Sequence, residues 1–296
     1  MVIDSKFIGK TYPESLYEIG REKVKEFIRA TKGDLSFYDE TLPLTFPVVY
    51  ASGLLEAILY DKELNLNLSK LVHGDQEFTY HTKARIGDVI KSFGIIENIF
   101  NKKGHDFVVF KVESFNQLAE LVCTQRMTFV VRGGNDVDFS FKEKFALKLA
   151  AIAAKFNPFE KKVSTEISLP EYQRLSDSEF TMKVFIDKYL PQRYAGASGD
   201  FNAIHLDDSL GKESGLGGYI LHGMATMALA ANLAVYYSGA DSVKAFKARF
   251  SKPVSPGDTL IYEAKLNREE SSSRIEIIAR DEYAKTVLEQ AYLDLA

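Results

Sequence analysis

The sequence predicts an α+β protein built from two tandem units, each with a helix wrapped by a curved antiparallel sheet. Three observations lead to this class. The run 224–234 is apolar and free of charge, which is typical of a helix buried on every side. Strand-like runs follow a helix in the first half, which favours an α+β arrangement. Three landmarks also recur in the same order about 170 residues apart, which indicates an internal duplication.

The composition limits the functional classes. Of 296 residues, 46% are hydrophobic and 26% charged, as in ordinary globular proteins. The net charge of −4 implies no broad basic field, which argues against nucleic acid as a partner. The single cysteine, Cys123, excludes an internal disulfide and a metal–thiolate site. The segment 1–14 lacks the apolar core of a signal peptide, so we expect a cytoplasmic protein.

The first unit, 1–134, is expected to be a non-catalytic copy. A helix is predicted over 18–31, where apolar residues recur at helical spacing, and it ends at Gly33-Asp34. A second, more apolar helix is predicted over 48–59. Strand-like runs follow at 76–83, 89–100, 106–115 and 118–131. The turn residues at 101–104 and 116–117 predict hairpins between the last three runs.

A connecting segment is predicted over 135–165, with an amphipathic helix at 141–156. It is too hydrophobic for a free linker, so we expect it to pack on the surface. The second unit, 166–296, holds the charge-free helix and a strand predicted over 259–268. This unit is expected to be the catalytic copy.

The second unit repeats landmarks of the first. The corresponding pairs are Gly33-Asp34 with Gly199-Asp200, 48–51 with 220–223, and Gly87-Asp88 with Gly257-Asp258. Each match is weak alone, but their shared order predicts a tandem duplication whose halves pack as a pseudo-dimer. The copies differ where chemistry is expected, because Asp39 stands opposite His205 and Tyr50 stands opposite His222.

The start of the charge-free helix is a candidate binding site. Glycines gather there at Gly215, Gly217, Gly218 and Gly223, and glycine lets the backbone approach a ligand. The first amides of a helix have no acceptor within the helix and favour negative charge. We therefore predict that the Gly223 amide forms an oxyanion hole for a carbonyl that becomes an enolate.

Three motifs resemble those of the MaoC-like (R)-specific enoyl-thioester hydratases and dehydratases. They are YAGASGDFNAIH at 194–205, ILHGM at 220–224 and ARFSKPVSPGD at 248–258. They occur in the family's order, and the two-copy layout resembles the family's double hot dog members over essentially the whole chain. The resemblance implies a double hot dog fold and a catalytic dyad of Asp200 and His205. The family usually has proline where this chain has Ala203, a change that removes no functional group.

The residue chemistry agrees with this resemblance. Adding water to an enoyl thioester requires a proton acceptor for water, a proton donor for the α-carbon and donors for the enolate oxygen. Asp200 and His205 can share the two proton transfers in either assignment. Asn202 is expected to orient the water or the dyad, and the Gly223 amide to bind the thioester oxygen.

Ser198 and His222 are further supporting candidates, although a structural hydrogen bond at the helix start explains His222 equally well. Asp200, His205 and His222 lack the spacing of a common metal-ligand set, and neither metal nor cofactor is predicted. Three other histidines are expected to be ordinary strand or turn residues: His73, His81 and His105.

The predicted function is the reversible hydration of trans-2-enoyl thioesters to (3R)-hydroxyacyl thioesters, or the reverse dehydration, in fatty-acid metabolism. Two alternatives remain, a hot dog acyl-thioesterase and a non-catalytic acyl-thioester binding subunit. The expected partner is an acyl-CoA or acyl carrier protein thioester, with neither nucleic acid nor membrane, and the chain is expected to be a monomer or a homodimer. A first unit freed of catalysis is expected to shape the acyl pocket, with 46–59 controlling chain length.

Overall fold

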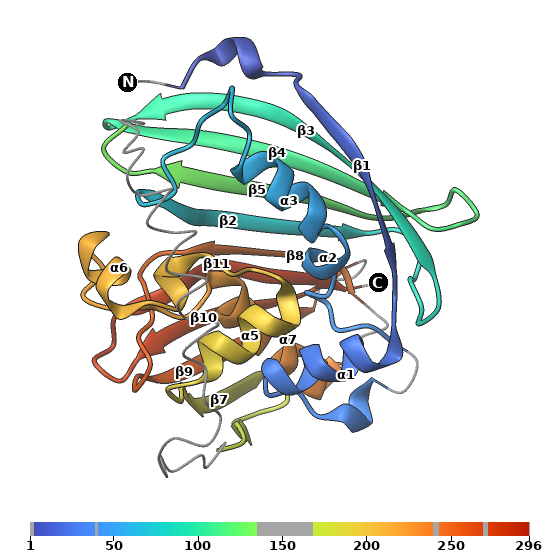
Figure 1. Ribbon diagram of the computed structural model, residues 1–296. Helices are drawn as coiled ribbons and strands as arrows, with labels where there is room; N and C mark the ends of the chain where they lie inside the picture. Colours follow the sequence, from blue (N-terminus) through green and yellow to red (C-terminus); the bar gives the residue numbers. More distant parts are fainter. Residues whose placement is uncertain (1–2, 39–40, 135–167, 239–242, 269–271, 296) are drawn as a thin grey trace, which may run out of the picture.

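The computed structural model describes residues 3–38, 41–134, 168–238, 243–268 and 272–295. Within these ranges the strands form one antiparallel sheet in the order β1-β3-β4-β5-β2-β8-β11-β10-β9-β7-β6 (Figure 1). The strands are β1 (Thr11–Glu18), β2 (Leu71–Tyr80), β3 (Val89–Lys102), β4 (His105–Phe115), β5 (Leu121–Val131), β6 (Glu171–Arg174), β7 (Glu179–Phe185), β8 (Val243–Phe250), β9 (Thr259–Arg268), β10 (Ser273–Asp281) and β11 (Thr286–Leu295).

The sheet confirms the predicted double hot dog fold. The order of the first-half strands is mirrored by that of the second half across the central β2–β8 pair. Glu77 lies opposite Lys247 in this pair, and their side chains form an ion pair at 3.1 Å. Because these residues are also equivalent in the two repeats, the pseudo-twofold axis passes through this pair, as in the self-complementary interface of a symmetric dimer. The predicted connecting segment 135–165 and its helix at 141–156 lie outside the described residues.

The repeated landmarks Gly87-Asp88 and Gly257-Asp258 are matching turns. Gly87 and Gly257 both have positive φ angles, +94° and +102°, a conformation that favours glycine. Asp88 and Asp258 each accept a backbone N–H at 2.7 Å from the residue three positions earlier. The sequence repeat therefore records a shared turn that leads into β3 in one half and β9 in the other.

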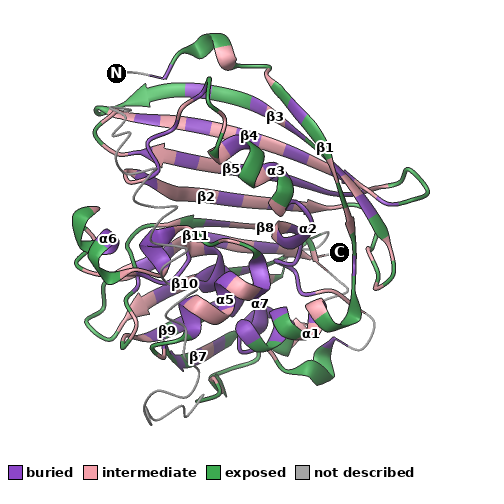
Figure 2. Cartoon of the chain, in the orientation of Figure 1, coloured by how far each residue is buried: buried purple, intermediate pink, exposed green. Residues whose placement is uncertain are grey.

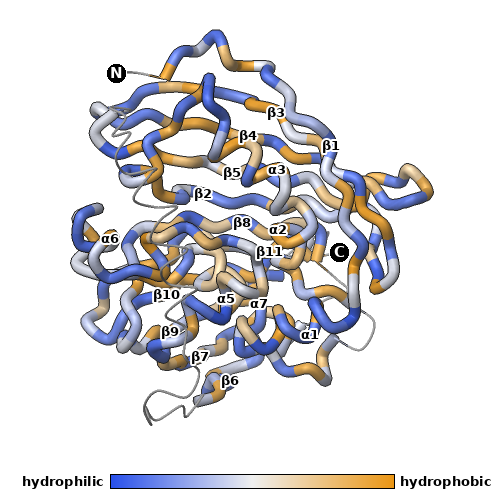
Figure 3. Tube along the Cα trace, viewed as in Figure 1, coloured by the Kyte–Doolittle hydropathy of each residue, from blue (hydrophilic) through white to orange (hydrophobic). Residues whose placement is uncertain are grey.

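The predicted strands lie where the structure has strands, but their ends are predicted less accurately than their positions. The run 259–268 coincides with β9, and 89–100, 106–115 and 118–131 correspond to β3, β4 and β5. The first run, 76–83, begins too late, because β2 starts at Leu71. Buried and partly exposed residues alternate along β4, as expected for strands with one face on a core. The hydropathy drawn in Figure 3 does not alternate in step, because residues 107–110 are all apolar.

The central helix of the second half is α7 (Gly223–Ser238). Every residue in 224–235 is buried, so the predicted helix without a solvent face is confirmed (Figure 2). It begins at Gly223 and no earlier, because the preceding segment pairs with other parts of the chain: Ile220 N–H donates to the Ile204 carbonyl at 3.0 Å. None of the described helices has the length and apolar character that crossing a membrane requires.

The first half has a shorter and broken central helix. The predicted helix over 48–59 is divided into α2 (Pro47–Tyr50) and α3 (Ser52–Leu59), with the break at Ala51. A Cβ on Gly53 would lie 2.8 Å from the Ser15 hydroxyl, so β1 approaches this helix closely. Because α3 has 8 residues and α7 has 16, the first half covers less of its own sheet.

Helix α1 (Arg21–Ala30) packs on the second half, beside α5 (Leu190–Ser198) (Figure 1). It starts later than predicted because 11–18 forms β1. The rings of Phe27 and Tyr194 lie 5.8 Å apart. The fully buried Lys32 ammonium donates to the Phe185 carbonyl at 2.9 Å and pairs with Asp187 at 3.3 Å. These contacts hold the first half against the second. The remaining short helices are η1 (Ser5–Phe7), η2 (Leu35–Phe37), η3 (Ala203–His205) and α6 (Asp208–Glu213).

Candidate active site

The loop after α5 is held by hydrogen bonds to its own backbone. Gly199 ends the helix in the left-handed region at φ +82°, where glycine is favoured. The Ser198 hydroxyl donates to the Tyr194 carbonyl at 2.7 Å and accepts the Asp200 N–H at 3.2 Å. Ser198 therefore anchors the loop to the last turn of α5.

Asp200 and Asn202 then turn the chain back toward the cavity. Oδ1 of Asp200 accepts the Asn202 N–H at 3.1 Å, and Oδ1 of Asn202 accepts the Ile204 N–H at 3.3 Å at the start of η3. This is turn chemistry of the kind that short polar side chains provide. Asp34, the repeat partner of Asp200, accepts the Ser36 N–H at 2.9 Å in the same way. The turn uses only one carboxylate oxygen of Asp200, and Asp200 lines the cavity.

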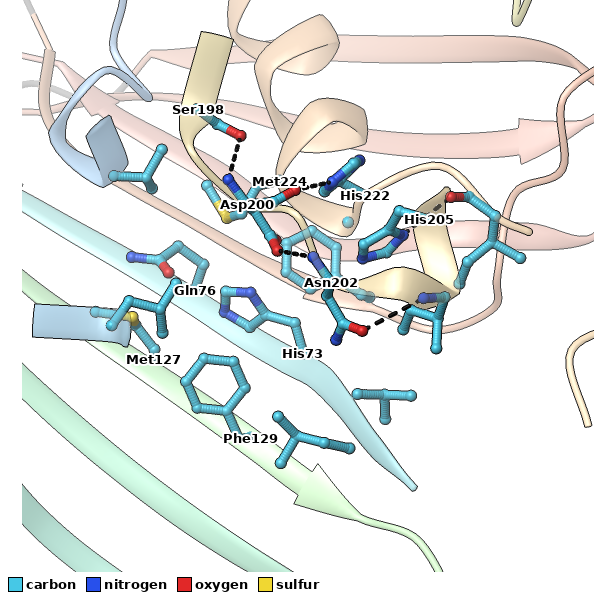
Figure 4. Close-up of a pocket in the computed structure, with 18 of the residues that line it drawn as sticks. His73, Gln76, Met127, Phe129, Ser198, Asp200, Asn202, His205, His222 and Met224 are labelled. Atoms are coloured by element: carbon cyan, nitrogen blue, oxygen red, sulfur yellow. Dashed lines mark hydrogen bonds between the residues drawn. The ribbon is translucent and has the colours of Figure 1, made fainter. Parts of the chain in front are cut away.

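His205 presents one free nitrogen beside this carboxylate. Its Nδ1 lies 2.9 Å from the Ile220 carbonyl oxygen, and because a carbonyl only accepts, Nδ1 carries the proton in the neutral ring. The lone pair is then on Nε2. His205 is 8% exposed, and ligand atoms of Asp200 and His205 lie within 4.8 Å of each other. The structure thus brings the predicted dyad together in the cavity wall (Figure 4).

His222 supports the loop from the start of α7. Its Nε2 donates to the Asp200 carbonyl oxygen at 2.9 Å. Its ring stacks on His205 with the centroids 3.8 Å apart and contacts Tyr194 at 4.9 Å. His222 therefore fixes the position of Asp200 and packs against the imidazole that faces the cavity, which is the structural role weighed for it from sequence.

The environment gives the Asp200 carboxylate and the two imidazoles different charge states. Burial alone would raise the pKa of Asp200, but the neighbouring imidazoles and the Asn202 amide outweigh it and hold the pKa below the ordinary aspartate value. Burial lowers the pKa of His205, and burial lowers the pKa of His222 to about 3. At neutral pH the site therefore contains an ionised carboxylate beside neutral imidazoles.

The start of α7 completes the site. The His222 carbonyl accepts the N–H groups of Ala225 and Thr226 at 3.0 and 3.2 Å. The Gly223 amide has no acceptor within the described ranges, and Gly223 lines the cavity. A Cβ at this position would lie 3.0 Å from the Phe250 ring, so the close packing of β8 on the helix start requires glycine here.

The structure corrects the prediction for the other clustered glycines. Gly215 and Gly217 have positive φ angles, +71° and +82°, and form the turn after α6. Gly218 packs against the Asp208 carboxylate. These three glycines do not lie at the start of α7, and Gly223 alone keeps the predicted position.

The predicted residues share one cavity of about 750 Å³ that both halves enclose. All six candidates line it: Ser198, Asp200, Asn202, His205, His222 and Gly223. The opposite wall comes from α3, β2 and β5 of the first half. Apolar side chains such as Leu55, Leu59 and Met127 dominate this wall, which suits a hydrocarbon chain.

His73 is a site residue that the sequence did not single out. It lies on β2 as expected of a strand residue, but its ring lines the cavity near Asp200 (Figure 4). Phe129 and Phe250 contact the ring at 4.9 and 5.1 Å, and Nε2 donates to the Asp75 carbonyl at 3.1 Å. Burial lowers the pKa of His73 to about 4.

A bulge in β2 aims His73 at the cavity. The register between β2 and β5 shifts between His73 and Asp75, and a Cβ on Gly74 would lie 2.9 Å from Val130. Bulges commonly redirect side chains near sites. A glycine inside a strand pattern is the sequence signal that could have indicated this bulge.

The same site suits a metal ion poorly. Among the described residues, Asp200, His205 and His222 bring one ligand atom each within 4.8 Å of one another. The two imidazole planes, however, are stacked at 24°. Ring lone pairs lie in these planes and run side by side rather than converging on one ion. One nitrogen of each ring already binds a carbonyl oxygen, so the arrangement fits proton transfer better.

Comparisons with known families match both halves of the chain. Residues 176–287 match the family described as MaoC like domain. Residues 6–125 match the family described as FAS1-like, dehydratase domain region. The second match covers the half that lacks the Asp200 and His205 pair.

The chain is also similar to individual proteins. A UPF0336 protein of Saccharopolyspora erythraea is 34% identical over 146 residues, which is 45% of this chain and 94% of that protein. The peroxisomal multifunctional enzyme type 2 of Mus musculus is 27% identical over 240 residues, which is 78% of this chain and 28% of that enzyme. The solved structure of a MaoC-like dehydratase superposes with a TM-score of 0.77 and 19% identity, covering 98% of both chains. The last likeness concerns the fold.

Proposed function

Because this chain belongs to the MaoC-like dehydratase family, we propose that it reversibly hydrates trans-2-enoyl thioesters to (3R)-hydroxyacyl thioesters without a cofactor. One observation carries the proposal. The Asp200 carboxylate and the His205 imidazole lie within 4.8 Å of each other in a cavity that also holds the Gly223 amide. These are the groups that adding water to a conjugated thioester requires.

The reaction begins with polarisation of the thioester. The Gly223 N–H donates to the thioester oxygen, which draws electrons from the β-carbon. A water molecule held between Asp200 and Nε2 of His205 attacks that carbon and loses one proton to Nε2. The electron pair of the double bond moves toward the carbonyl, and the resulting enolate oxygen is stabilised by the Gly223 amide. One such donor contributes a factor of about 10²–10³ in rate.

The enolate then takes the proton from His205 at its α-carbon. This step restores the neutral imidazole and completes the addition of one hydrogen and one hydroxyl group. Dehydration follows the same steps in reverse. Because one nitrogen accepts the proton from water and returns it to carbon, no second acid is needed.

The environment favours His205 over Asp200 as the proton carrier. Burial lowers the pKa of His205 overall, but the ionised Asp200 carboxylate stabilises an imidazolium beside it and acts against that lowering. The Nδ1–H bond to the Ile220 carbonyl also favours the charged ring. Asp200 itself has a lowered pKa, which makes it a weak proton acceptor. It therefore orients the water and stabilises the charge that forms on His205.

The first half serves as the acyl-binding wall. Its short α3 leaves a cavity of about 750 Å³ between the two halves, within the range of pockets for small-molecule ligands. The thioester carrier, coenzyme A or an acyl carrier protein, would remain outside while the acyl chain lies against β2 and β5.

A single assay separates hydration from the other activities. Crotonyl-CoA is incubated with the protein while its conjugated absorbance is followed, and a thiol reagent reports free coenzyme A in parallel. Loss of absorbance without free thiol is the expected result. Release of thiol would instead indicate an acyl-thioesterase. Binding of the thioester with neither change would indicate a non-catalytic subunit.

A further inference from the structure

Two glutamines in the acyl-binding wall have carbonyl oxygens without a hydrogen-bond partner among the described residues. Gln76 and Gln125 are both 0% exposed and both line the cavity. Nε2 of Gln125 donates to the Pro47 carbonyl at 3.0 Å, and Nε2 of Gln76 lies 3.4 Å from the Glu77 carbonyl. In the described part of the chain, neither Oε1 atom has an acceptable hydrogen-bond geometry with a donor, although the Gln76 amide lies close enough to the His73 ring to act against the lowering of its pKa.

The orientation of the Gln125 amide is set by its partner. The Pro47 carbonyl can only accept, so the NH₂ group of Gln125 must face it and Oε1 must face elsewhere. Flipping the amide would place two carbonyl oxygens together. The atom without a partner in the cavity wall is therefore the carbonyl oxygen of Gln125, and not its NH₂ group.

Both glutamines lie on the same face of two neighbouring strands. Gln76 pairs with Met127, and Phe78 pairs with Gln125, which places the two glutamines diagonally, about 7–8 Å apart. Gln76 is three positions further along β2 than His73, away from the reacting groups (Figure 4). Tyr194 also lines the cavity, and its buried hydroxyl has no hydrogen-bond partner within the ranges that the structure describes.

The fold itself does not require a glutamine here. The pseudo-twofold axis through Glu77 and Lys247 makes Phe246 of the second half equivalent to Gln76. Phe246 is 0% exposed and belongs to the core. One repeat thus buries an aromatic ring where the other buries an amide.

A plain hydrocarbon chain fits this wall poorly. It would displace water from the cavity and leave both carbonyl oxygens against methylene groups, and an unpaired buried acceptor costs its full desolvation. A hydroxyl group on the chain can donate to one of these oxygens. We propose that the acyl-binding cavity selects thioesters whose chain carries a hydroxyl group beyond the reacting carbons. This inference rests on the proposed hydratase function and specifies its substrate class.

The test compares matched substrates. The hydration rate is measured for trans-2-enoyl-CoA thioesters of increasing chain length and for their ω-hydroxy counterparts. For at least one chain length, kcat/KM should be about tenfold higher for the hydroxylated compound, because sites built to bind a hydroxyl discriminate against analogues that lack it. Gln76→Met and Gln125→Met keep side-chain length and should remove the preference. Gln173→Met on the exposed β6 should leave it unchanged.

The outcomes distinguish a failure of this inference from a failure of the proposed hydratase function. Hydration of plain and hydroxylated chains at equal kcat/KM by the wild type would overturn the inference and leave the hydratase proposal intact. If neither class is hydrated, the hydratase proposal fails, and calorimetric binding of the two classes of 3-hydroxyacyl-CoA then decides the preference. Equal binding would overturn the inference. Thermal unfolding of each variant shows whether a lost preference reflects a lost fold.

Discussion

Asn232, in the middle of the buried helix α7, donates from Nδ2 to the Thr31 carbonyl oxygen at 2.7 Å. Its Oδ1 accepts the Tyr38 hydroxyl at 3.1 Å. The one amide within the charge-free run therefore joins the central helix of the second half to the end of α1 in the first. This link explains a polar side chain where the helix otherwise buries only apolar groups and Thr226.

Replacing this amide should weaken the whole molecule. Asn232→Ala leaves a buried carbonyl and a buried hydroxyl without partners, which should lower the free energy of unfolding by about 3 kcal/mol. Denaturant unfolding measures the change, and Asn98→Ala on the exposed face of β3 is the control. A loss no larger than that of Asn98→Ala would show that the link contributes nothing to stability.

The helix start should tolerate no side chain at Gly223. The Cβ of Gly223→Ala would lie 3.0 Å from the Phe250 ring, so the helix start or the ring must move. We expect kcat for crotonyl-CoA hydration to fall at least about tenfold through misplacement of the amide donor.

The control for this change is another helical glycine. A Cβ on Gly196 in α5 meets only the Glu26 carboxylate at 3.8 Å. Because alanine is the better helix former, Gly196→Ala should leave kcat unchanged and stability equal or higher. Equal kcat values for Gly223→Ala and Gly196→Ala would exclude the proposed role of the Gly223 amide.

The buried histidines should make stability fall in acid. Burial lowers the pKa of His73 to about 4 and that of His222 to about 3, below the ordinary value of 6.5. Below pH 6.5 the unfolded chain binds protons that the folded protein does not. The resulting loss of stability is absent above pH 6.5, grows as the pH falls from 6.5 toward the folded pKa values, and levels off below them.

His73→Phe tests this dependence. Between pH 7 and pH 5, denaturant unfolding should show the wild type losing about 2 kcal/mol more than the variant. The same substitution at His81, which lies outside the cavity lining, controls for the loss of a histidine. Parallel stability curves for wild type and His73→Phe would contradict the buried, neutral state of this ring.

The first half should set the chain-length preference. Leu55 lines the cavity on α3, and Leu55→Ala enlarges the acyl-binding wall. We expect the ratio of kcat/KM for long over short enoyl-CoA thioesters to rise about tenfold, with little change for crotonyl-CoA. Leu118→Ala, at a 72% exposed position, serves as the control. An unchanged ratio would show that the acyl chain does not reach α3.

The features that could be predicted from sequence are those that depend on local patterns. The buried helix α7 follows from a run without charges, and the paired turns at Gly87 and Gly257 follow from the repeat. Asp200 and His205 lie on one short loop, so their proximity needs little long-range information.

The rest of the site depends on how the halves meet. His73, Gln76 and Gln125 reach the cavity because β2 and β5 form its wall and β2 pairs with β8. The spacing of residues in the sequence does not indicate that β2 pairs with β8. The packing of α1 on α5 is likewise a property of the assembled halves.

The central claim is that Asp200 and His205 carry the proton transfer of hydration. The repeat supplies a matched control, because Asp34 makes the same turn hydrogen bond as Asp200 but lies outside the cavity lining. The decisive measurement is kcat/KM for crotonyl-CoA hydration by Asp200→Asn, His205→Gln and Asp34→Asn. We predict losses of about 10²–10⁴-fold for the first two and wild-type activity for the third. Near wild-type hydration by folded Asp200→Asn or His205→Gln would contradict the account.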